Sequence, residues 1–127
     1  MSARKPFSYA IIRVVPRVER GERLNAGVVL YSRQHRFLGA KVGLDETRLH
    51  AIAPDVEPAA VCAHLEAIER IAAGDPAAGP IAALDPSERF GWIVAPSSTM
   101  IQPSRVHTGL TDDPAAMLEK LYSELVA

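Results

Sequence analysis

The sequence predicts an α+β fold in which an antiparallel sheet of four to five strands has two main helices packed on one face. Three apolar stretches follow one another between residues 7 and 42, and two segments with helical spacing come later. No internal repeat or low-complexity tract interrupts this order. Strands first and helices after them is an order typical of antiparallel sheets.

The first three strands are expected at residues 7–15, 25–32 and 36–42, where β-branched and aromatic side chains are frequent. Pro16 ends the first of them. The following loop contains Gly21 and is longer than a tight hairpin turn, so the first two strands should pair antiparallel through an extended charged loop. Three consecutive strands of this kind form a meander.

Capping residues mark the expected helices. Asp45 is placed to cap a short helix that Pro54 ends, and a longer helix should run from Pro58 to a stop at Gly74. Residues 74–88 form a connector with one helical turn near 81–84.

The C-terminal third predicts two more strands and a helix. Residues 89–95, Arg-Phe-Gly-Trp-Ile-Val-Ala, alternate in the manner of a fourth strand. Residues 100–106 predict a fifth, irregular edge strand, because Pro103 lacks a ladder donor. Asp113 and Pro114 then begin the last helix.

Length and composition indicate a single domain over residues 1–127. The chain is 48% hydrophobic and 23% charged, and no apolar run approaches the roughly 18 residues that span a bilayer. The basic N-terminus precedes only a short apolar strand, too little for the apolar region of a signal peptide. We therefore expect a cytoplasmic protein with no membrane association.

The net charge of −1 conceals an asymmetry between the two halves. Residues 1–50 hold ten basic and four acidic residues, whereas residues 51–127 hold four and eleven. A basic half can bind an acidic or phosphorylated partner or RNA, or it can be covered by acidic helices of the same molecule. The intramolecular explanation is favoured because surface charges are usually only solvated, and nucleic-acid binding is not expected.

The first hairpin holds the main candidate polar site. Arg13 interrupts an apolar stripe and needs a partner, for which Glu22 is the leading candidate. Asn25 begins the returning strand, and Gly27 permits a close approach. Two interpretations are open: a clasp of these residues that fixes the hairpin register, with Gly27 beneath an aromatic such as Trp92, or one wall of a ligand pocket.

A second polar run extends from Pro96 to Thr99 and on to His107. Hydroxyls, an amide and an imidazole suit an anion site, although Ser and Thr after Pro commonly form turns. For an enzyme, Arg89, Gln102 and His107 would face the first group across a shared cavity. Glu22 would then be the general acid or base, and an arginine the anion clamp.

Metal and cofactor sites are not predicted. The four histidines lack ligand spacing, and no glycine-rich phosphate-binding loop is present. An edge strand at the end of the sheet would permit a homodimer.

Several motifs resemble one known family: Arg-Gly-Glu-Arg-Leu-Asn-Ala-Gly at 20–27, Arg-Phe-Gly-Trp at 89–92, Ala-Pro-Ser-Ser at 95–98 and Thr-Asp-Asp-Pro at 111–114. Together they span essentially the whole chain and resemble small bacterial proteins catalogued as domain of unknown function three-thousand-thirty-seven. The resemblance implies no catalytic residue or cofactor, and it implies a genomic association with kinases similar to the HipA type.

Two functional hypotheses follow. The first is a non-catalytic interaction or regulatory module that partners a kinase-like protein through the loop arginines Arg17, Arg20 and Arg23. The alternative is an enzyme or small-ligand binder that acts on an anionic substrate through Arg13, Glu22, Asn25 and His107.

Overall fold

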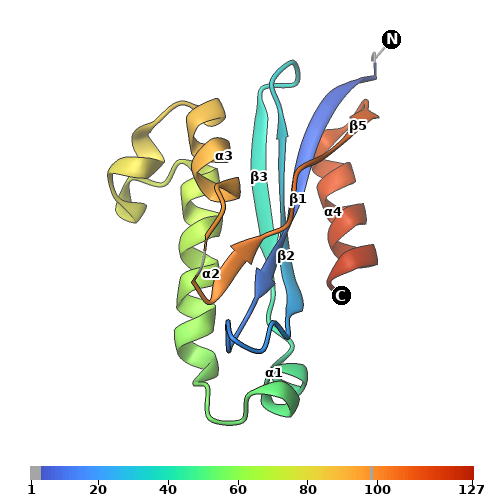
Figure 1. The fold of residues 1–127 in the computed structure, drawn as a ribbon. Helices are drawn as coiled ribbons and strands as arrows, with labels where there is room; N and C mark the ends of the chain where they lie inside the picture. Colours follow the sequence, from blue (N-terminus) through green and yellow to red (C-terminus); the bar gives the residue numbers. More distant parts are fainter. Residues whose placement is uncertain (1–3, 98) are drawn as a thin grey trace.

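The computed structural model describes residues 4–97 and 99–127 and confirms the α+β class (Figure 1). Five strands form one antiparallel sheet in the order β3-β2-β1, and both β4 and β5 pair with the remaining edge of β1. The strands are β1 (Lys5–Val14), β2 (Leu24–Ser32), β3 (Phe37–Val42), β4 (Ile101–Pro103) and β5 (His107–Thr111). The helices are α1 (Glu46–Ile52), α2 (Pro58–Ala73), α3 (Pro86–Val94) and α4 (Pro114–Leu125), with 3-10 turns at Pro76–Ala78 and Pro80–Ala83.

The predicted meander is confirmed, and it contains one irregularity. Ile12 is the partner of Gly27, but the next residue, Arg13, is the partner of Asn25, so Ala26 is an extra residue on β2. Such a β-bulge reverses the direction of the side chains beyond it. The carbonyl of Ala26 accepts a hydrogen bond from the N–H of Gly43 at 2.8 Å, which fixes the bulge against the end of β3.

Three predicted helix starts are confirmed by their caps. The side chain of Asp45 accepts from the N–H of Arg48, and that of Asp113 accepts from the N–H of Ala116. α2 begins at Pro58, as expected. It ends at Gly74, whose φ of 73° is the left-handed conformation that glycine adopts readily.

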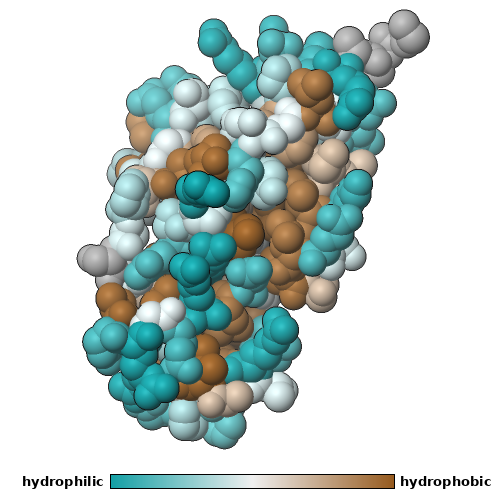
Figure 2. Space-filling view, turned by 45° about the vertical axis from the view of Figure 1, so that its right-hand side comes forward, coloured by the Kyte–Doolittle hydropathy of each residue, from teal (hydrophilic) through white to brown (hydrophobic). Residues whose placement is uncertain are grey.

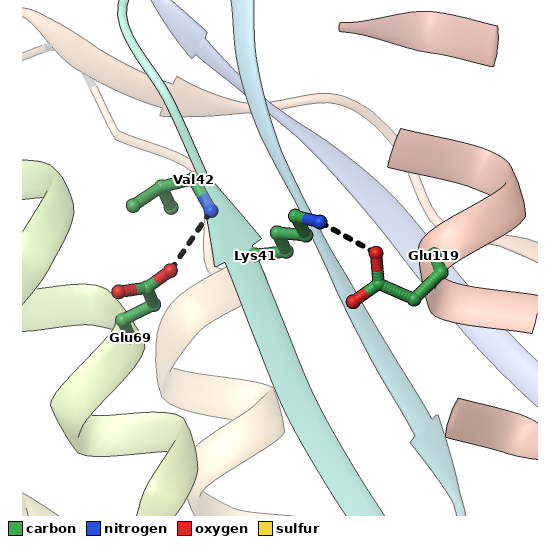
Figure 3. A network of polar contacts seen from close by, with 4 residues as sticks. All are labelled: Lys41, Val42, Glu69 and Glu119. Atoms are coloured by element: carbon green, nitrogen blue, oxygen red, sulfur yellow. Dashed lines mark hydrogen bonds and ion pairs between the residues drawn. The ribbon is translucent and has the colours of Figure 1, made fainter. Parts of the chain in front are cut away.

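The two main helices lie on opposite faces of the sheet, so the prediction that both cover one face is wrong (Figure 1). Figure 3 shows the two sides at β3, where the N–H of Val42 donates to Glu69 of α2 at 3.0 Å. On the other side, Lys41 Nζ donates to Glu119 of α4 at 2.5 Å. The cause is that β1 and β2 carry apolar side chains on both faces, and each apolar face needs a cover.

Two hydrophobic cores result. The larger one packs α1, α2 and α3 against one face, and its fully buried side chains include Ile12, Val14, Leu49, Val61 and Leu65. The smaller one packs α4 against the other face around Phe7, Val28, Leu30 and Leu118.

Residues 89–95 do not form the predicted fourth strand, because residues 89–94 belong to α3 and Ala95 is its C-cap. The side chain of Asp85 accepts from the N–H of Glu88 at 3.0 Å, and Pro86 occupies the first turn. Both features favour a helix start. Phe90 and Ile93 are three residues apart and both enter the larger core, as on a helix.

The prediction of an irregular strand at residues 100–106 is partly confirmed, because β4 occupies Ile101–Pro103 within that range. The sequence did not predict β5, which follows at His107–Thr111. Ser104 joins the two strands. Its N–H donates to the carbonyl of Ile11 at 2.8 Å, and its Oγ accepts from the N–H of Ile11 at 2.8 Å. The side chain thus continues the ladder where the backbone departs from it.

Candidate functional site

Arg13, Asn25 and Gln102 come together on the sheet. Arg13 on β1 is the partner of Asn25 on β2 and of Gln102 on β4. Both amides have structural partners: Asn25 Nδ2 donates to the carbonyl of Leu125 at 2.9 Å, and Gln102 Nε2 donates to that of Thr99 at 2.9 Å. They hold the end of α4 and the turn before β4.

The predicted clasp between Arg13 and Glu22 does not form. Glu22 Oε1 accepts instead from Arg20 Nε at 2.6 Å, and this hydrogen bond raises the pKa of Arg20. Burial, followed by the charge of Arg23, lowers the pKa of Arg13. Two guanidinium groups are therefore near each other at this end of the sheet.

Two of the three predicted partner-binding arginines have carboxylate partners within the molecule. Arg17 donates to Asp55 at 2.5 Å, and Arg20 pairs with Glu22. Among the described residues, no ion pair involves Arg23, which is exposed. The loop therefore presents less free positive charge than its sequence suggests.

Gly27 permits a close approach, as predicted, but its neighbour is β3 and not Trp92. A Cβ at this position would lie 2.9 Å from the carbonyl oxygen of Lys41 and 2.9 Å from Cγ1 of Val42. Trp92 is 50% exposed on α3.

Arg89 is a cap for another helix. Its Nη1 donates to the carbonyls of Ile71 at 3.1 Å and Ala72 at 2.9 Å, at the C-terminal end of α2. A cation at this end also interacts favourably with the helix dipole. Arg89 therefore ties α3 to α2.

His107 is apart from the Arg13 group. Its ring stacks on Tyr9 with centroids 5.2 Å apart. Tyr9 and Arg13 are four residues apart on β1, a distance of about 13 Å along a strand. None of the main hollows of the described surface is lined by Arg13, Glu22 or His107. The geometry therefore gives no shared cavity for the two polar groups.

An apolar cleft of about 380 Å³ lies between α2, the end of α3 and β4. Its lining is Ile12, His64, Ala67, Ile68, Ile71, Trp92, Ile93, Ala95, Pro96, Ser97, Thr99, Ile101 and Pro103. Ser98, part of the predicted polar run, lies outside the described residues. The lining includes no carboxylate and one imidazole, so it suits apolar contact better than acid–base chemistry.

Sequence reasoning missed this cleft because it placed Trp92 in a strand. The signal that reveals it is the sequence Asp-Pro-Ser-Glu at 85–88, which combines a capping residue, a first-turn proline and a carboxylate three residues later. Once the helix begins there, Phe90 and Ile93 face the core and Trp92 faces outward.

A second hollow, of about 410 Å³, lies at the end of the sheet next to α1. Arg23, Asn25 and Arg48 line it together with Leu24, Ala51 and Ile52. Arg48 is 3.9 Å from Asp45, a long and exposed ion pair. This hollow brings a predicted site amide together with Arg23, which has no ion pair among the described residues, and Arg48, whose ion pair is long.

A model of one protein family matches residues 9–126 of the chain. The chain belongs to the family described as Protein of unknown function (DUF3037). No curated protein and no solved structure matches it.

The matched DUF3037 span begins within β1 and ends just after α4, so both hollows lie inside the family domain. In the part of this DUF3037 chain that the structure describes, no cluster of three or more His, Cys, Asp or Glu could hold a metal ion. No helix among residues 4–97 and 99–127 is long and apolar enough to cross a membrane.

Proposed function

We propose that this DUF3037 chain is a non-catalytic interaction module that binds a protein partner through the apolar cleft beside Trp92. The observation that carries the proposal is that the only tryptophan of the chain is half exposed at the edge of an apolar cleft. Tryptophan is among the residues most enriched at the energetic centres of protein interfaces.

The exposed part of Trp92 is large enough to matter for binding. Covering about 100 Å² of its apolar surface would contribute about 2.5 kcal/mol, which corresponds to roughly 70-fold in affinity. Ile68 and Ile101, from α2 and β4, line the same cleft and extend the apolar surface. An inserted side chain would therefore contact three elements at once.

A kinase-like protein is the first partner class to test, because the family resemblance implies it. The proposal includes a bacterial, cytoplasmic setting, and one free cysteine is compatible with a reducing compartment. Nucleic acid is not part of the proposal. Arg17 and Arg20 already pair with carboxylates, which leaves little of the loop charge for phosphates.

The test compares Trp92→Ala with Leu84→Ala. Leu84 is also an exposed large hydrophobic residue, at 37%, but it does not line the cleft. Partners captured from the native host are purified, and their affinities for the two variants are measured by calorimetry. We expect Trp92→Ala to weaken binding at least tenfold and Leu84→Ala to leave it unchanged. Equal affinities, or no partner retained at moderate salt, would refute the proposal.

A second candidate function is the binding of a small anion at the hollow lined by Arg23, Asn25 and Arg48. The observation that favours it is that two guanidinium groups, those of Arg23 and Arg48, line the hollow beside the Asn25 amide, because a bound anion would relieve the repulsion between like charges. Glu22 does not take part, since Arg20 holds it. Titration with inorganic phosphate, followed by NMR, should shift the Asn25 side-chain amide in the wild type and not in Arg23→Gln. An unmoved amide at low salt would exclude this function.

A further inference from the structure

β5 forms an open edge of the sheet (Figure 1). It pairs with β1 on one side, from Lys5–Thr111 to Tyr9–His107, and no described strand pairs with its other side. An open edge presents unpaired N–H and C=O groups to any strand that can align with it.

The direction of the free backbone groups follows from Pro6. Its carbonyl accepts a hydrogen bond from Ser32 Oγ on β2, so the backbone groups of Pro6 point away from β5. Leu110 is the partner of Pro6. It therefore occupies a non-hydrogen-bonded pair, and its own N–H and C=O point to the open side, where the carbonyl accepts a long hydrogen bond of 3.4 Å from Arg4 Nη2. By alternation along the strand, those of Thr108 point there too, and continuing the alternation by one step beyond β5 gives the same direction for Val106.

The edge strand itself carries no side chain that prevents pairing, and the one charged group that reaches its backbone in the described residues is Arg4, through the long hydrogen bond to the Leu110 carbonyl. No residue from 106 to 111 is Asp, Glu, Lys, Arg or Pro. Natural edge strands are usually protected by such residues. Val106 and Leu110 are 42% and 50% exposed. Figure 2 shows the side of the molecule that carries α4 and β5, where apolar side chains form a band flanked by hydrophilic ones.

We propose that β5 is a dimerisation edge, which pairs antiparallel with β5 of a second copy of this chain about a two-fold axis at Thr108. This register uses the outward N–H and C=O groups of Val106, Thr108 and Leu110 in both copies, and it replaces the long hydrogen bond from Arg4 to the Leu110 carbonyl by one from the second copy. It also places Val106 of one copy opposite Leu110 of the other, twice by symmetry. Each exposed apolar residue thus covers the other on the same face of the joined sheet.

Charge complementarity also favours a second copy of this chain as the partner of β5. In this register Arg105 of one copy is opposite Thr111 of the other, one residue from Asp112, so opposite charges flank the paired segment at both ends. The residues between them are uncharged, and Arg4, whose Nη2 donates to the Leu110 carbonyl, has to turn away from the edge when a second copy pairs there. A second copy therefore fits the edge by its backbone, its apolar pair and its flanking charges.

The dimer is expected to be weak, because a strand of five residues buries less than a standard protein interface. A dissociation constant on the order of 100 μM is reasonable for such a contact. Sedimentation equilibrium at loading concentrations on both sides of that value should show a monomer–dimer equilibrium in the wild type. A monomer at every concentration would overturn the proposal.

Thr108→Pro tests most directly whether β5 is the dimerisation edge. It removes the outward N–H at the axis, whereas the ladder with β1 does not use that group, so the monomer should keep its fold. Thr108→Val is the matched control, since it keeps the amide and a β-branched side chain. We expect the proline variant to weaken dimerisation roughly tenfold or more and the valine variant to preserve it. Dimerisation of Thr108→Pro as strong as that of the wild type would refute the proposal that β5 is the dimerisation edge.

A pair of double variants tests the register and does not depend on proline. Val106→Glu with Leu110→Lys puts opposite charges across the axis, whereas Val106→Lys with Leu110→Lys puts like charges there. The first should dimerise and the second should not. Equal behaviour of the two would rule out the register. Trp92→Ala should leave the dimer intact, so failure of this proposal and failure of the cleft proposal are distinguishable.

Discussion

Replacement of Arg89 by Met tests the contact that ties α3 to α2. Methionine keeps a long apolar side chain and removes the guanidinium group. Both hydrogen bonds from Nη1 to the last carbonyls of α2 are lost, at 3.1 and 2.9 Å. The positive charge at the end of the helix is lost with them.

The expected cost is about 2 kcal/mol. Hydrogen bonds to a charged group contribute about 1.5–3 kcal/mol each, but hydration of the freed carbonyls returns part of this. Arg89 Nε is buried without a partner among the described residues, so its removal also relieves an existing penalty. For a domain of 127 residues, 2 kcal/mol corresponds to a fall in Tm of about 7 °C.

Urea denaturation measures this cost with two probes. Circular dichroism reports the whole fold, and the fluorescence of Trp92, on the same helix as Arg89, reports α3. Arg89→Lys should lie between wild type and Arg89→Met, because an ammonium keeps the charge but cannot reproduce the guanidinium geometry. A free energy of unfolding for Arg89→Met within about 0.5 kcal/mol of wild type would refute the capping role.

Three further variants test local features. Gly27→Ala should lower the free energy of unfolding by about 1–3 kcal/mol, because its Cβ would lie 2.9 Å from the carbonyl of Lys41; a value near zero in urea denaturation would contradict the close approach. Gly91→Ala, where a Cβ meets nothing within 4 Å, should instead stabilise α3 by about 0.5–1 kcal/mol, and a loss of stability would contradict its exposed helical position. The backbone N–H of Glu88 lowers the pKa of Asp85, so this aspartate contributes stability above its unfolded pKa of about 4 and loses it as pH falls through the lower folded value. Asp85→Asn should therefore differ most from wild type at neutral pH and least in acid, and a difference that grows in acid would reverse the assigned sign.

The sequence predicts the helix ends and the first hairpin well because local chemistry decides them. Asp45, Pro58, Gly74 and Asp113 act through caps and backbone angles within a few residues, and each predicted boundary agrees with the structure. Residues 89–95 have the alternation and the aromatic content of a strand, although Asp85 and Pro86 favour a helix start before them. A strand there would allow Trp92 to cover Gly27, whereas Trp92 is half exposed on α3.

The face of the sheet that α4 covers and the ion-pair partner of Glu22 were harder to predict, because each is a choice between two alternatives that local sequence does not decide. Both faces of β1 are apolar, a pattern that indicates cover on both sides, yet strand alternation alone does not assign a helix to a face. Glu22 had a near neighbour in Arg20 and a distant one in Arg13. The near one forms the ion pair, because closing a short loop costs less entropy.

Because Ala26 is an extra residue in β2, the chain should tolerate insertions differently before and after Leu24. The turn before Leu24 is solvent-exposed over residues 17–21, so added residues there would lengthen a loop without moving any core side chain. Between Leu24 and Val28 the residue count is fixed, because Leu24 belongs to the core under α2 and Val28 to the core under α4. A one-residue deletion there would exchange the two sides and bring Asn25 into an apolar core. Homologous chains should therefore vary in the length of this turn and keep the spacing from residue 24 to residue 28.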